Sequence, residues 1–270
     1  MTRDMKVARF ISQNRILTGV LDDSHHARRI EGDLFNGYVV TDERVPVDRL
    51  LAPIVPTDIL CIGLNYRRHA EETGSVVPPT PLLFIKSSNT LHHPGEPIVL
   101  PKNSSMVDYE AELCVVIGKA ARHVKESEAL NYVLGYTCAN DVSARDWQRD
   151  KSLGGGQFAR GKSFDTFCPL GPYIITADEI PDPNSLRIRC ELNGKTVQDS
   201  TTADMIYSVS TLIASLSSTM TLRPGAVILT GTPEGVGMGR TPPLWLSDGD
   251  RVVVEIEKIG RLENPVIAEK

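Results

Sequence analysis

The sequence lacks the features of proteins that work in membranes, on nucleic acids or outside the cell. No apolar run approaches the roughly 18 residues of a transmembrane helix. No run of lysine and arginine is present to displace the counterions of a nucleic acid, and the formal net charge is −5. The N-terminal stretch MTRDMKVARFIS has no apolar core of a signal peptide. We therefore expect neither a membrane nor a nucleic-acid partner.

Cysteine is scarce and shows no pairing pattern. No CxxC pair occurs, and each of the five cysteines lies in an apolar or strand-like segment: Cys61, Cys114, Cys138, Cys168 and Cys190. Such scattered residues are typical of buried free thiols in a reducing compartment. The pattern predicts a cytoplasmic protein.

What the sequence does contain is a long series of short, β-prone segments separated by turn residues. Apolar residues at clear helical spacing occur over 205–220, and shorter helical patterns occur at 67–74 and 127–135. Strands and helices do not alternate, which disfavours a doubly wound fold. The pattern predicts a mixed, mostly β (α+β) architecture.

The first fifth of the chain differs from the rest. Strand-like segments fill residues 6–40, with an Asn-Gly hairpin signal at 36–37. Residues 41–58 contain three prolines and are interpreted as a linker. We therefore predict a small β-rich N-terminal domain at 1–55 and a larger domain at 56–270.

Acidic residues interrupt two of the apolar segments. Asp108, Glu110 and Glu112 are spaced by two, which places them on one face of a strand, and Asp141 ends another segment. Buried carboxylates this close repel one another. Two interpretations stay open at this point. The acids face solvent from an edge strand, or Glu110, Glu112 and Asp141 bind a divalent cation. A set of oxygen ligands alone favours Mg²⁺, Mn²⁺ or Ca²⁺ over Zn²⁺.

His69 and Glu72 are three residues apart in the helical pattern at 67–74, so their side chains can meet. A carboxylate that binds one imidazole nitrogen fixes the tautomer and suits the histidine to act as a general base. The alternative is a solvated helix tip that carries mixed charges.

Three further polar side chains lie between apolar segments. Arg145, Gln148 and Lys162 could stabilise an oxyanion or bind a carboxylate. Arg145 could equally pair with a structural acid such as Asp146 or Asp165.

A glycine-rich loop, AVILTGTPEGVGMG, covers residues 226–239. It lacks the GK[ST] motif and the following helix of a phosphate-binding loop, which argues against a nucleotide-dependent reductase. We interpret it as a loop that lines a small-molecule site, with a hydroxyl from Thr230 or Thr232.

The order of these motifs resembles the fumarylacetoacetate hydrolase family. It runs from about Asp58 to Val266 through GLNYxxHxxE, PLLFIKSSNT, YEAELCVVIGK, GYTCANDVSARDWQ, RGKSFDTFCPLGPYIIT, ILTGTPEGVG and LSDGDRVVVEIEKIGRLENPV. The resemblance implies a compact mixed β-roll that packs as a homodimer. It also implies that Glu110, Glu112 and Asp141 hold a catalytic Mg²⁺, with Mn²⁺ or Ca²⁺ in some members.

The resemblance assigns roles to seven more residues. His69 and Glu72 match a His–Glu dyad on a segment that orders over the ligand in relatives. The residues that match positions near the reacting oxygen are Gln148 and Lys162, and those that match positions close to the substrate are Lys86, Arg145 and Thr232. The stretch LCIGLNY lacks a further aspartate ligand of fumarylacetoacetase itself, so the chain resembles the smaller diketo-acid enzymes.

The activity that the resemblance implies is hydrolytic C–C cleavage of a 2,4-dioxo acid of the acylpyruvate or fumarylpyruvate type. The route is a metal-chelated enolate and a water activated by His69 and Glu72. Alternatives are oxaloacetate decarboxylation, isomerisation of 2-hydroxyhepta-2,4-diene-1,7-dioate or 5-carboxymethyl-2-hydroxymuconate, and metal or ligand binding without catalysis. We expect the substrate tail to be recognised by residues 73–80, 149–158 and 236–245.

Overall fold

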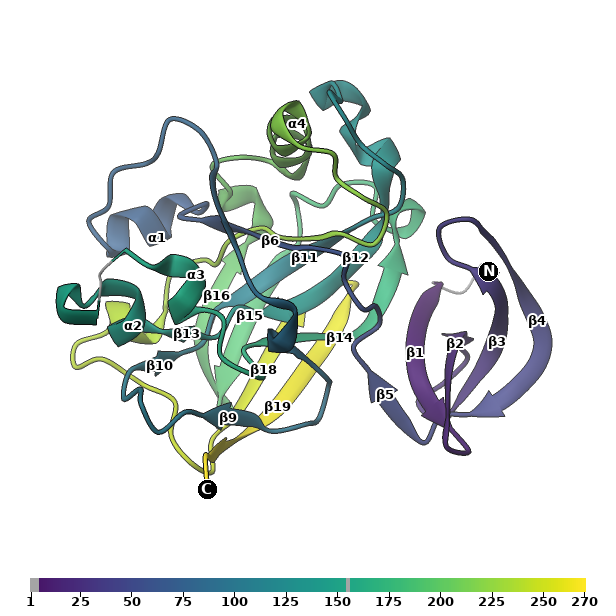
Figure 1. The fold of residues 1–270 in the computed structure, drawn as a ribbon, viewed down its shortest axis with the longest axis horizontal. Coiled ribbons are helices and arrows are strands. Elements are labelled where there is room, and N and C mark those ends of the chain that lie inside the picture. Colours follow the sequence, from purple (N-terminus) through teal and green to yellow (C-terminus); the bar gives the residue numbers. More distant parts are fainter. Residues whose placement is uncertain (1–4, 154–155) are drawn as a thin grey trace.

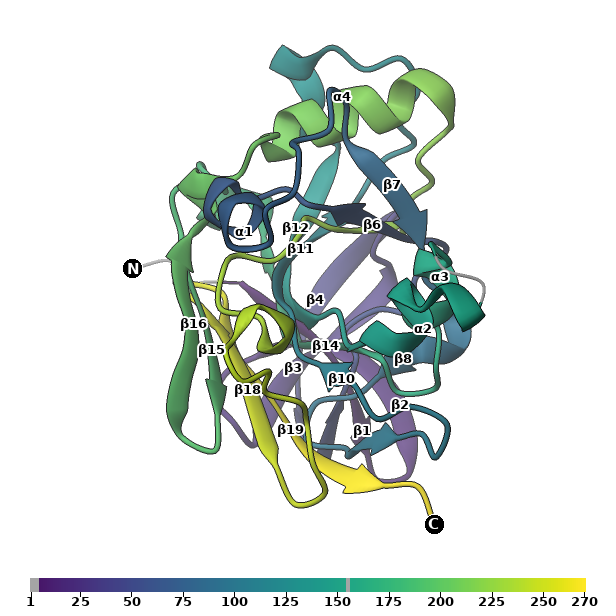
Figure 2. The same cartoon turned by 90° about the vertical axis from the view of Figure 1, so that its left-hand side faces the viewer.

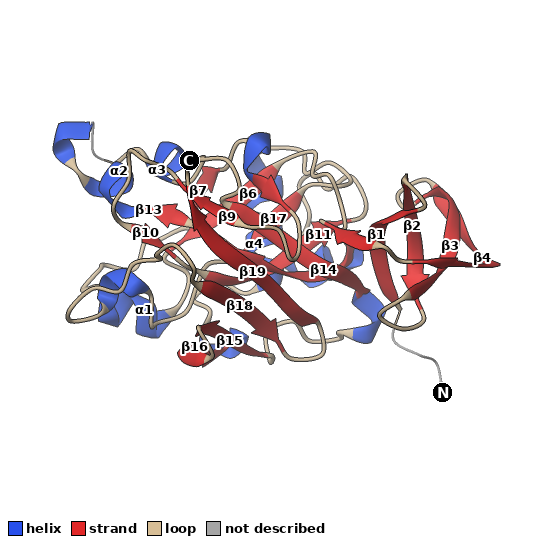
Figure 3. Cartoon of the chain, turned by 90° about the horizontal axis from the view of Figure 1, so that it is seen from below, coloured by secondary structure: helices blue, strands red, loops and turns tan. Residues whose placement is uncertain are grey.

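The computed structural model describes residues 5–153 and 156–270 of the chain. Strands make up most of its regular structure (Figure 3), which confirms the mixed, mostly β fold. The helices are α1 (Arg67–Glu72), α2 (Arg145–Arg149), α3 (Phe158–Gly161) and α4 (Val209–Thr219). The strands are β1 (Lys6–Ser12), β2 (Arg15–Leu21), β3 (His26–Asp33), β4 (Gly37–Pro46), β5 (Arg49–Leu51), β6 (Ile59–Gly63), β7 (Leu82–Ile85), β8 (Leu91–His92), β9 (Ile98–Leu100), β10 (Val107–Asp108), β11 (Ala111–Ile117), β12 (Val133–Asn140), β13 (Ser143–Ala144), β14 (Cys168–Thr176), β15 (Arg187–Leu192), β16 (Lys195–Thr201), β17 (Val227–Leu229), β18 (Arg251–Ile256) and β19 (Gly260–Ala268).

One large sheet connects the N-terminal strands to the rest of the chain (Figures 1 and 2). Its main path follows the order β4-β3-β2-β1-β14-β12-β11-β17-β6-β7, while β5 pairs with β1 and β8 pairs with β14. A five-stranded sheet has the order β16-β15-β18-β19-β9, and β10 pairs with β13. The region of the candidate site is therefore built from strands that are far apart in the sequence.

Strand β11 lies inside the large sheet, between β12 and β17, and is buried on both faces. Leu113 and Val115 pack into the core cluster that also contains the apolar side of α4, whereas Cys114 and Val116 pack into a second cluster. Successive strand residues point to opposite faces, so both faces of this strand meet a core. The interpretation of an edge strand with solvated acids is therefore wrong.

The N-terminal strands β1 to β4 form a meander at one end of the molecule (Figure 1). β1 also pairs with β14, so the meander continues the large sheet. The expected linker at 41–58 is partly wrong, because β4 extends to Pro46 and β5 follows it. β4 is an edge strand, where charged residues and a closing proline are tolerated. The division at 55 and 56 stays a prediction.

Two elements differ from what the hydrophobic periodicity of the sequence predicted. β16, with the sequence KTVQDST, was not expected because it has few apolar residues, and it is one of the two edge strands of the five-stranded sheet. The helix expected over 205–220 begins only at Val209, after Ser208 caps its first turn. Its buried residues, including Leu212 and Ile213, are those that the helical spacing predicted.

The cysteine prediction is confirmed, since all five thiols are free and buried. Among the described residues, no helix has both the length and the apolar character needed to cross a membrane.

Candidate active site

A cavity of about 150 Å³ is lined in part by residues of the three short helices α1, α2 and α3. These helices lie at the end of the molecule away from β1 to β4 (Figures 1 and 3). Its polar lining comprises His69, Thr73, Ser75, Glu110, Glu112, Asp141, Arg145, Gln148, Arg149, Lys162 and Thr232. Its apolar lining includes Ile62, Leu64, Leu82, Phe84, Phe158 and Met238. The structure thus brings most of the predicted site residues to one cavity.

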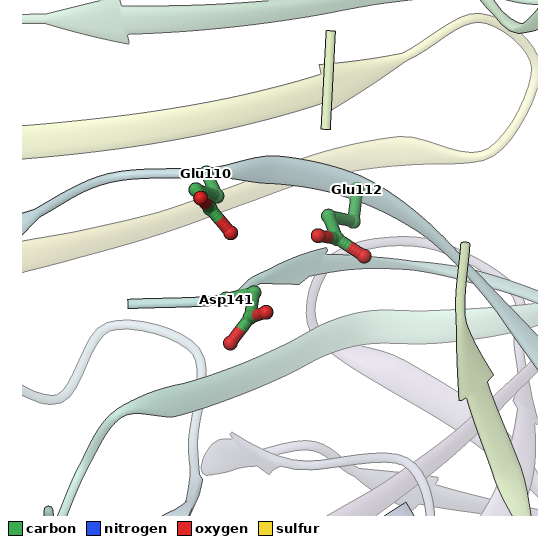
Figure 4. Close-up of side chains that lie close together, drawn as sticks. All are labelled: Glu110, Glu112 and Asp141. Carbon is green, nitrogen blue, oxygen red and sulfur yellow. The ribbon is translucent and has the colours of Figure 1, made fainter. Parts of the chain in front are cut away.

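Three carboxylates converge on this cavity (Figure 4). Glu110 directly precedes β11, Glu112 is its second residue, and Asp141 follows the neighbouring strand β12. The Asp141 N–H donates to the Glu110 carbonyl over 2.9 Å, which fixes the two chain segments side by side. One oxygen of each carboxylate lies within 4.8 Å of the others, and all three residues are buried. The spacing argument for this group of acids is therefore supported by geometry.

Two lysines offset part of this negative charge. Lys162 Nζ donates to both Glu110 Oε2 and Asp141 Oδ2 over 2.6 Å, and Lys86 Nζ donates to Asp141 Oδ1 over 2.6 Å. Burial raises the pKa of Glu110, but the cations of Lys162 and Arg145 outweigh it and hold that pKa below its ordinary value. Glu110 is therefore ionised at neutral pH.

Arg145 has a different partner from those that the sequence suggested. Its Nε donates to Asp108 Oδ2 over 2.9 Å and its Nη2 donates to Glu110 Oε1 over 2.6 Å. The pairing with Asp146 or Asp165 is wrong, since those acids bind loop groups instead. Asp108 thus holds the arginine beside the carboxylate triad and is not one of the grouped ligand candidates.

Glu112 is the member of the triad whose negative charge is not paired with a cationic side chain of the described residues. Its Oε2 accepts from the Gly231 N–H over 2.7 Å, and it forms no ion pair with any described residue. Burial, followed by repulsion from Asp141 and Glu110, raises the pKa of Glu112 well above its ordinary value. An uncompensated buried carboxylate is costly unless a cation binds it.

The donor set fits a hard divalent cation. The residues that would hold it are Glu110, Glu112 and Asp141, which offer only oxygen atoms. Ligand distances of 2.0–2.6 Å place oxygens on opposite sides of Mg²⁺ or Ca²⁺ about 4–5 Å apart. The observed spread of up to 4.8 Å is compatible with this range.

The histidine and the glutamate of α1 form the predicted pair. His69 Nδ1 lies 3.1 Å from Glu72 Oε2, and Glu72 Oε1 accepts from the Gly235 N–H over 2.9 Å. Burial raises the pKa of Glu72, but the hydrogen bonds from His69 and Gly235 lower it below the ordinary 4.5. Because an ionised carboxylate can only accept, neutral His69 carries its proton on Nδ1 and leaves Nε2 as the base. The solvated helix tip is excluded, since His69 is buried.

The glycine-rich loop binds acids through its backbone and not through hydroxyls. The N–H groups of Gly231, Gly235 and Gly237 donate to Glu112, Glu72 and Asp108, which are three acids of the site. Gly235 has φ +95°, and a Cβ there would lie 2.2 Å from the Val197 carbonyl oxygen, so only glycine fits.

Both threonines of this loop have committed hydroxyls. Thr230 donates to the Leu113 carbonyl, and Thr232 donates to the Ala111 carbonyl while it accepts from Gln198. Thr232 lines the cavity, but its hydroxyl proton already holds the loop against β11. The predicted hydroxyl role is therefore structural in this arrangement.

The remaining predicted residues differ in access to the cavity. Gln148 accepts from Arg145 Nη1 through Oε1, and its amide nitrogen has no hydrogen-bond partner among the described residues. This nitrogen is available to a substrate oxygen. Lys86 is not part of the cavity lining and acts through Asp141. Lys162 lines the cavity and also lies 5.0 Å from the centroid of the Phe84 ring.

The segments expected to recognise the substrate tail each contribute to the cavity wall. Thr73 and Ser75 come from 73–80, Arg149 and Phe158 from 149–158, and Met238 from 236–245. Sequence reasoning did not single out Phe84, which lines the cavity, or Gln198 of β16, which holds both the Ala111 N–H and the glycine-rich loop. No short motif marks these two residues, because each reaches the site through tertiary packing.

Comparison with known proteins agrees with this arrangement. The chain matches the family described as fumarylacetoacetate (FAA) hydrolase C-terminal over residues 58–267 and the family described as Rv2993c-like, N-terminal over residues 5–53. A buried carboxylate triad beside a histidine–glutamate pair on a mostly β fold is typical of the active site of an enzyme. The chain belongs to the fumarylacetoacetate hydrolase family.

Relatives with described activities include isomerases and tautomerases. The mitochondrial oxaloacetate tautomerase fahd2 of Xenopus laevis is 50% identical over 219 residues, covering 81% of this chain and 68% of the relative. The fumarylacetoacetate hydrolase domain-containing protein 2 homolog of Dictyostelium discoideum is 47% identical, covering 84% and 77%. The crystal structure of 2-hydroxyhepta-2,4-diene-1,7-dioate isomerase from Mycobacterium marinum superimposes with a TM-score of 0.85 at 38% identity, covering 98% and 99%.

Proposed function

We propose that this protein is a metal-dependent tautomerase that interconverts the enol and keto forms of a small 2-oxo acid such as oxaloacetate. The observation that carries the proposal is the position of His69, which faces the same cavity as the carboxylate triad while Glu72 fixes its tautomer. This arrangement can move a proton at the carbon next to a carbonyl group. The relative from Xenopus laevis is named for that chemistry.

Each residue has a role in the proton transfer. In the keto-to-enol direction, His69 Nε2 takes a proton from the carbon beside the 2-oxo group and gives it to the 2-oxo oxygen, and ketonisation is the reverse. Glu72 stabilises the imidazolium that forms between the two transfers. Gln148 and Lys162 donate hydrogen bonds to the oxygen on which negative charge develops. A divalent cation, when bound by the triad, supplies Lewis-acid stabilisation of the same oxygen.

The size of the cavity suits a small substrate. Its volume of about 150 Å³ has room for a four-carbon acid, and the cavity shares Leu82, Phe84 and Phe158 with a neighbouring surface pocket.

Hydrolytic cleavage of an acylpyruvate is the second candidate. It is favoured by the same hydrogen bond between His69 and Glu72, because a histidine oriented by a carboxylate can deprotonate water as well as carbon. Tautomerisation needs no water in the cavity, whereas hydrolysis does.

One panel of assays separates these activities. Purified protein with Mg²⁺ or with EDTA is given enol-oxaloacetate, and ketonisation is followed by the loss of enol absorbance. Pyruvate release from oxaloacetate and from acetylpyruvate is measured in parallel. Mg²⁺-dependent ketonisation that exceeds pyruvate release supports the proposal.

The control must remove catalysis by free Mg²⁺. His69→Gln keeps the triad and removes the base, so its rate with Mg²⁺ gives the background. Faster pyruvate release from acetylpyruvate than ketonisation would move the assignment to the hydrolase. Equal ketonisation by the wild-type protein and His69→Gln would exclude the proposed tautomerase.

A further inference from the structure

One cation of the cavity wall has no acidic partner. Arg149 is the last residue of α2, lines the cavity with the carboxylate triad and is exposed to solvent. In the described part of the chain it makes no hydrogen bond or ion pair. By contrast, Arg145 and Lys162, which line the same cavity, both bind carboxylates. Arg149 is thus the cation of this wall that remains free to bind an anion.

The acids nearest to Arg149 in the sequence are engaged elsewhere. Asp146 accepts hydrogen bonds from the loop that precedes β10, and Asp150 accepts from the backbone and hydroxyl of Ser152. Partial burial, followed by repulsion from Arg145, lowers the pKa of Arg149, and attraction by Glu110 offsets part of this effect. A carboxylate bound directly to Arg149 would add to that attraction.

We propose that Arg149 binds the second carboxylate of a 2-oxo dicarboxylic acid and so selects dicarboxylic over monocarboxylic substrates. The inference rests on the proposed function, which places the 2-oxo acid end of the substrate at the triad. The distal carboxylate then meets a guanidinium whose planar fork matches it. A neutral tail, such as the methyl ketone of acetylpyruvate, gains nothing from Arg149.

The test uses two stable analogues of equal chain length. Malate and 2-hydroxybutanoate differ only in the distal carboxylate, which is a methyl group in the second. Calorimetric titration of the Mg²⁺-saturated protein should show preferential binding of malate. Arg149→Gln should weaken malate binding about tenfold or more, because a charge-assisted bond is lost, and change 2-hydroxybutanoate binding less than about twofold.

Two control variants sharpen the result. Arg160→Gln removes an equal charge close by, from a guanidinium that stacks 4.6 Å from the Trp147 ring centroid, and should leave both affinities unchanged. Arg149→Lys keeps the positive charge but lacks the planar guanidinium, so it should show part of the preference for malate that Arg149→Gln loses. A wild-type protein without preference for malate, or an Arg149→Gln variant that keeps the preference, would overturn the inference.

The ketonisation assay separates this inference from the proposed function. If the wild-type protein does not accelerate ketonisation but Arg149→Gln abolishes the malate preference, the tautomerase is wrong and the carboxylate site stands. If ketonisation is fast and the preference survives Arg149→Gln, the tautomerase stands and the carboxylate site is wrong.

Discussion

Glu110→Gln and Glu112→Gln should change the stability of the metal-free protein in opposite directions. The first should lower it and the second should raise it. Glu110 accepts from Arg145 and Lys162, so Glu110→Gln breaks one ion pair of each buried cation, while Arg145 keeps Asp108 and Lys162 keeps Asp141. Breaking buried ion pairs in this way costs about 3–5 kcal/mol. Glu112 forms no ion pair with a described residue, so Glu112→Gln mainly removes repulsion within the triad.

The size of this repulsion follows from the geometry. Two unit charges 4.8 Å apart repel by about 3.5 kcal/mol at an effective dielectric constant of about 20. Protonation limits the cost, because a carboxyl group with an ordinary pKa of 4.5 can be neutralised at pH 7 for about 3.4 kcal/mol. The amide of Glu112→Gln can still accept from Gly231. We therefore expect this variant to be more stable by about 1–3 kcal/mol.

Thermal unfolding in EDTA and in excess Mg²⁺ measures both effects. In EDTA, Glu112→Gln should melt above the wild-type protein and Glu110→Gln below it. Mg²⁺ at 100 times its Kd should stabilise the wild-type protein by about 2.7 kcal/mol, and both variants should lose most of this response. Glu128→Gln, an exposed control, should match the wild-type protein in both conditions. A Glu112→Gln protein that melts below the wild-type protein in EDTA would refute the reasoning.

Three further predictions concern single residues. His69→Gln should slow ketonisation roughly 100-fold or more while oxalate affinity, measured by calorimetry, stays within about twofold, because the base is lost and the triad is kept. Since the pKa of Glu72 lies below 4.5 in the folded protein, its stabilising effect is present above that value and is lost at lower pH. The difference in Tm between Glu72→Gln and the wild-type protein should therefore be constant from about pH 8 to pH 5 and decrease as the pH falls below 4.5. Lys86→Met leaves Asp141 Oδ1 unpaired and should lower the urea unfolding free energy by about 3 kcal/mol, with partial recovery in Mg²⁺.

Local spacing predicted the acids of the site but not their partners. The two-residue period placed Glu110 and Glu112 together, and the end of an apolar segment marked Asp141. The cations that stabilise them come from distant segments, since Lys86 is 55 residues from Asp141 and Arg145 is 35 residues from Glu110. Such pairings depend on how the sheet is assembled, which periodicity does not describe.

The fold itself was predicted where the pattern was strong. The buried strand β11 and the apolar face of α4 followed from their sequences, whereas β16 and the end of β4 did not. Both of the latter are edge strands, which bury fewer apolar residues and so carry a weaker signal. Gln198 was missed with β16, although it holds the loop that carries Thr232.

The glycine-rich loop allows substrate preference to change independently of the catalytic groups. Its contacts with Glu112, Glu72 and Asp108 use main-chain amides, which substitution of the non-glycine residues would preserve. Met238 of the same loop lines the cavity. A substitution at position 238 therefore changes the cavity wall while the acids stay in place. Within this short loop, one position can vary, whereas the neighbouring glycines that hold the acids must stay constant.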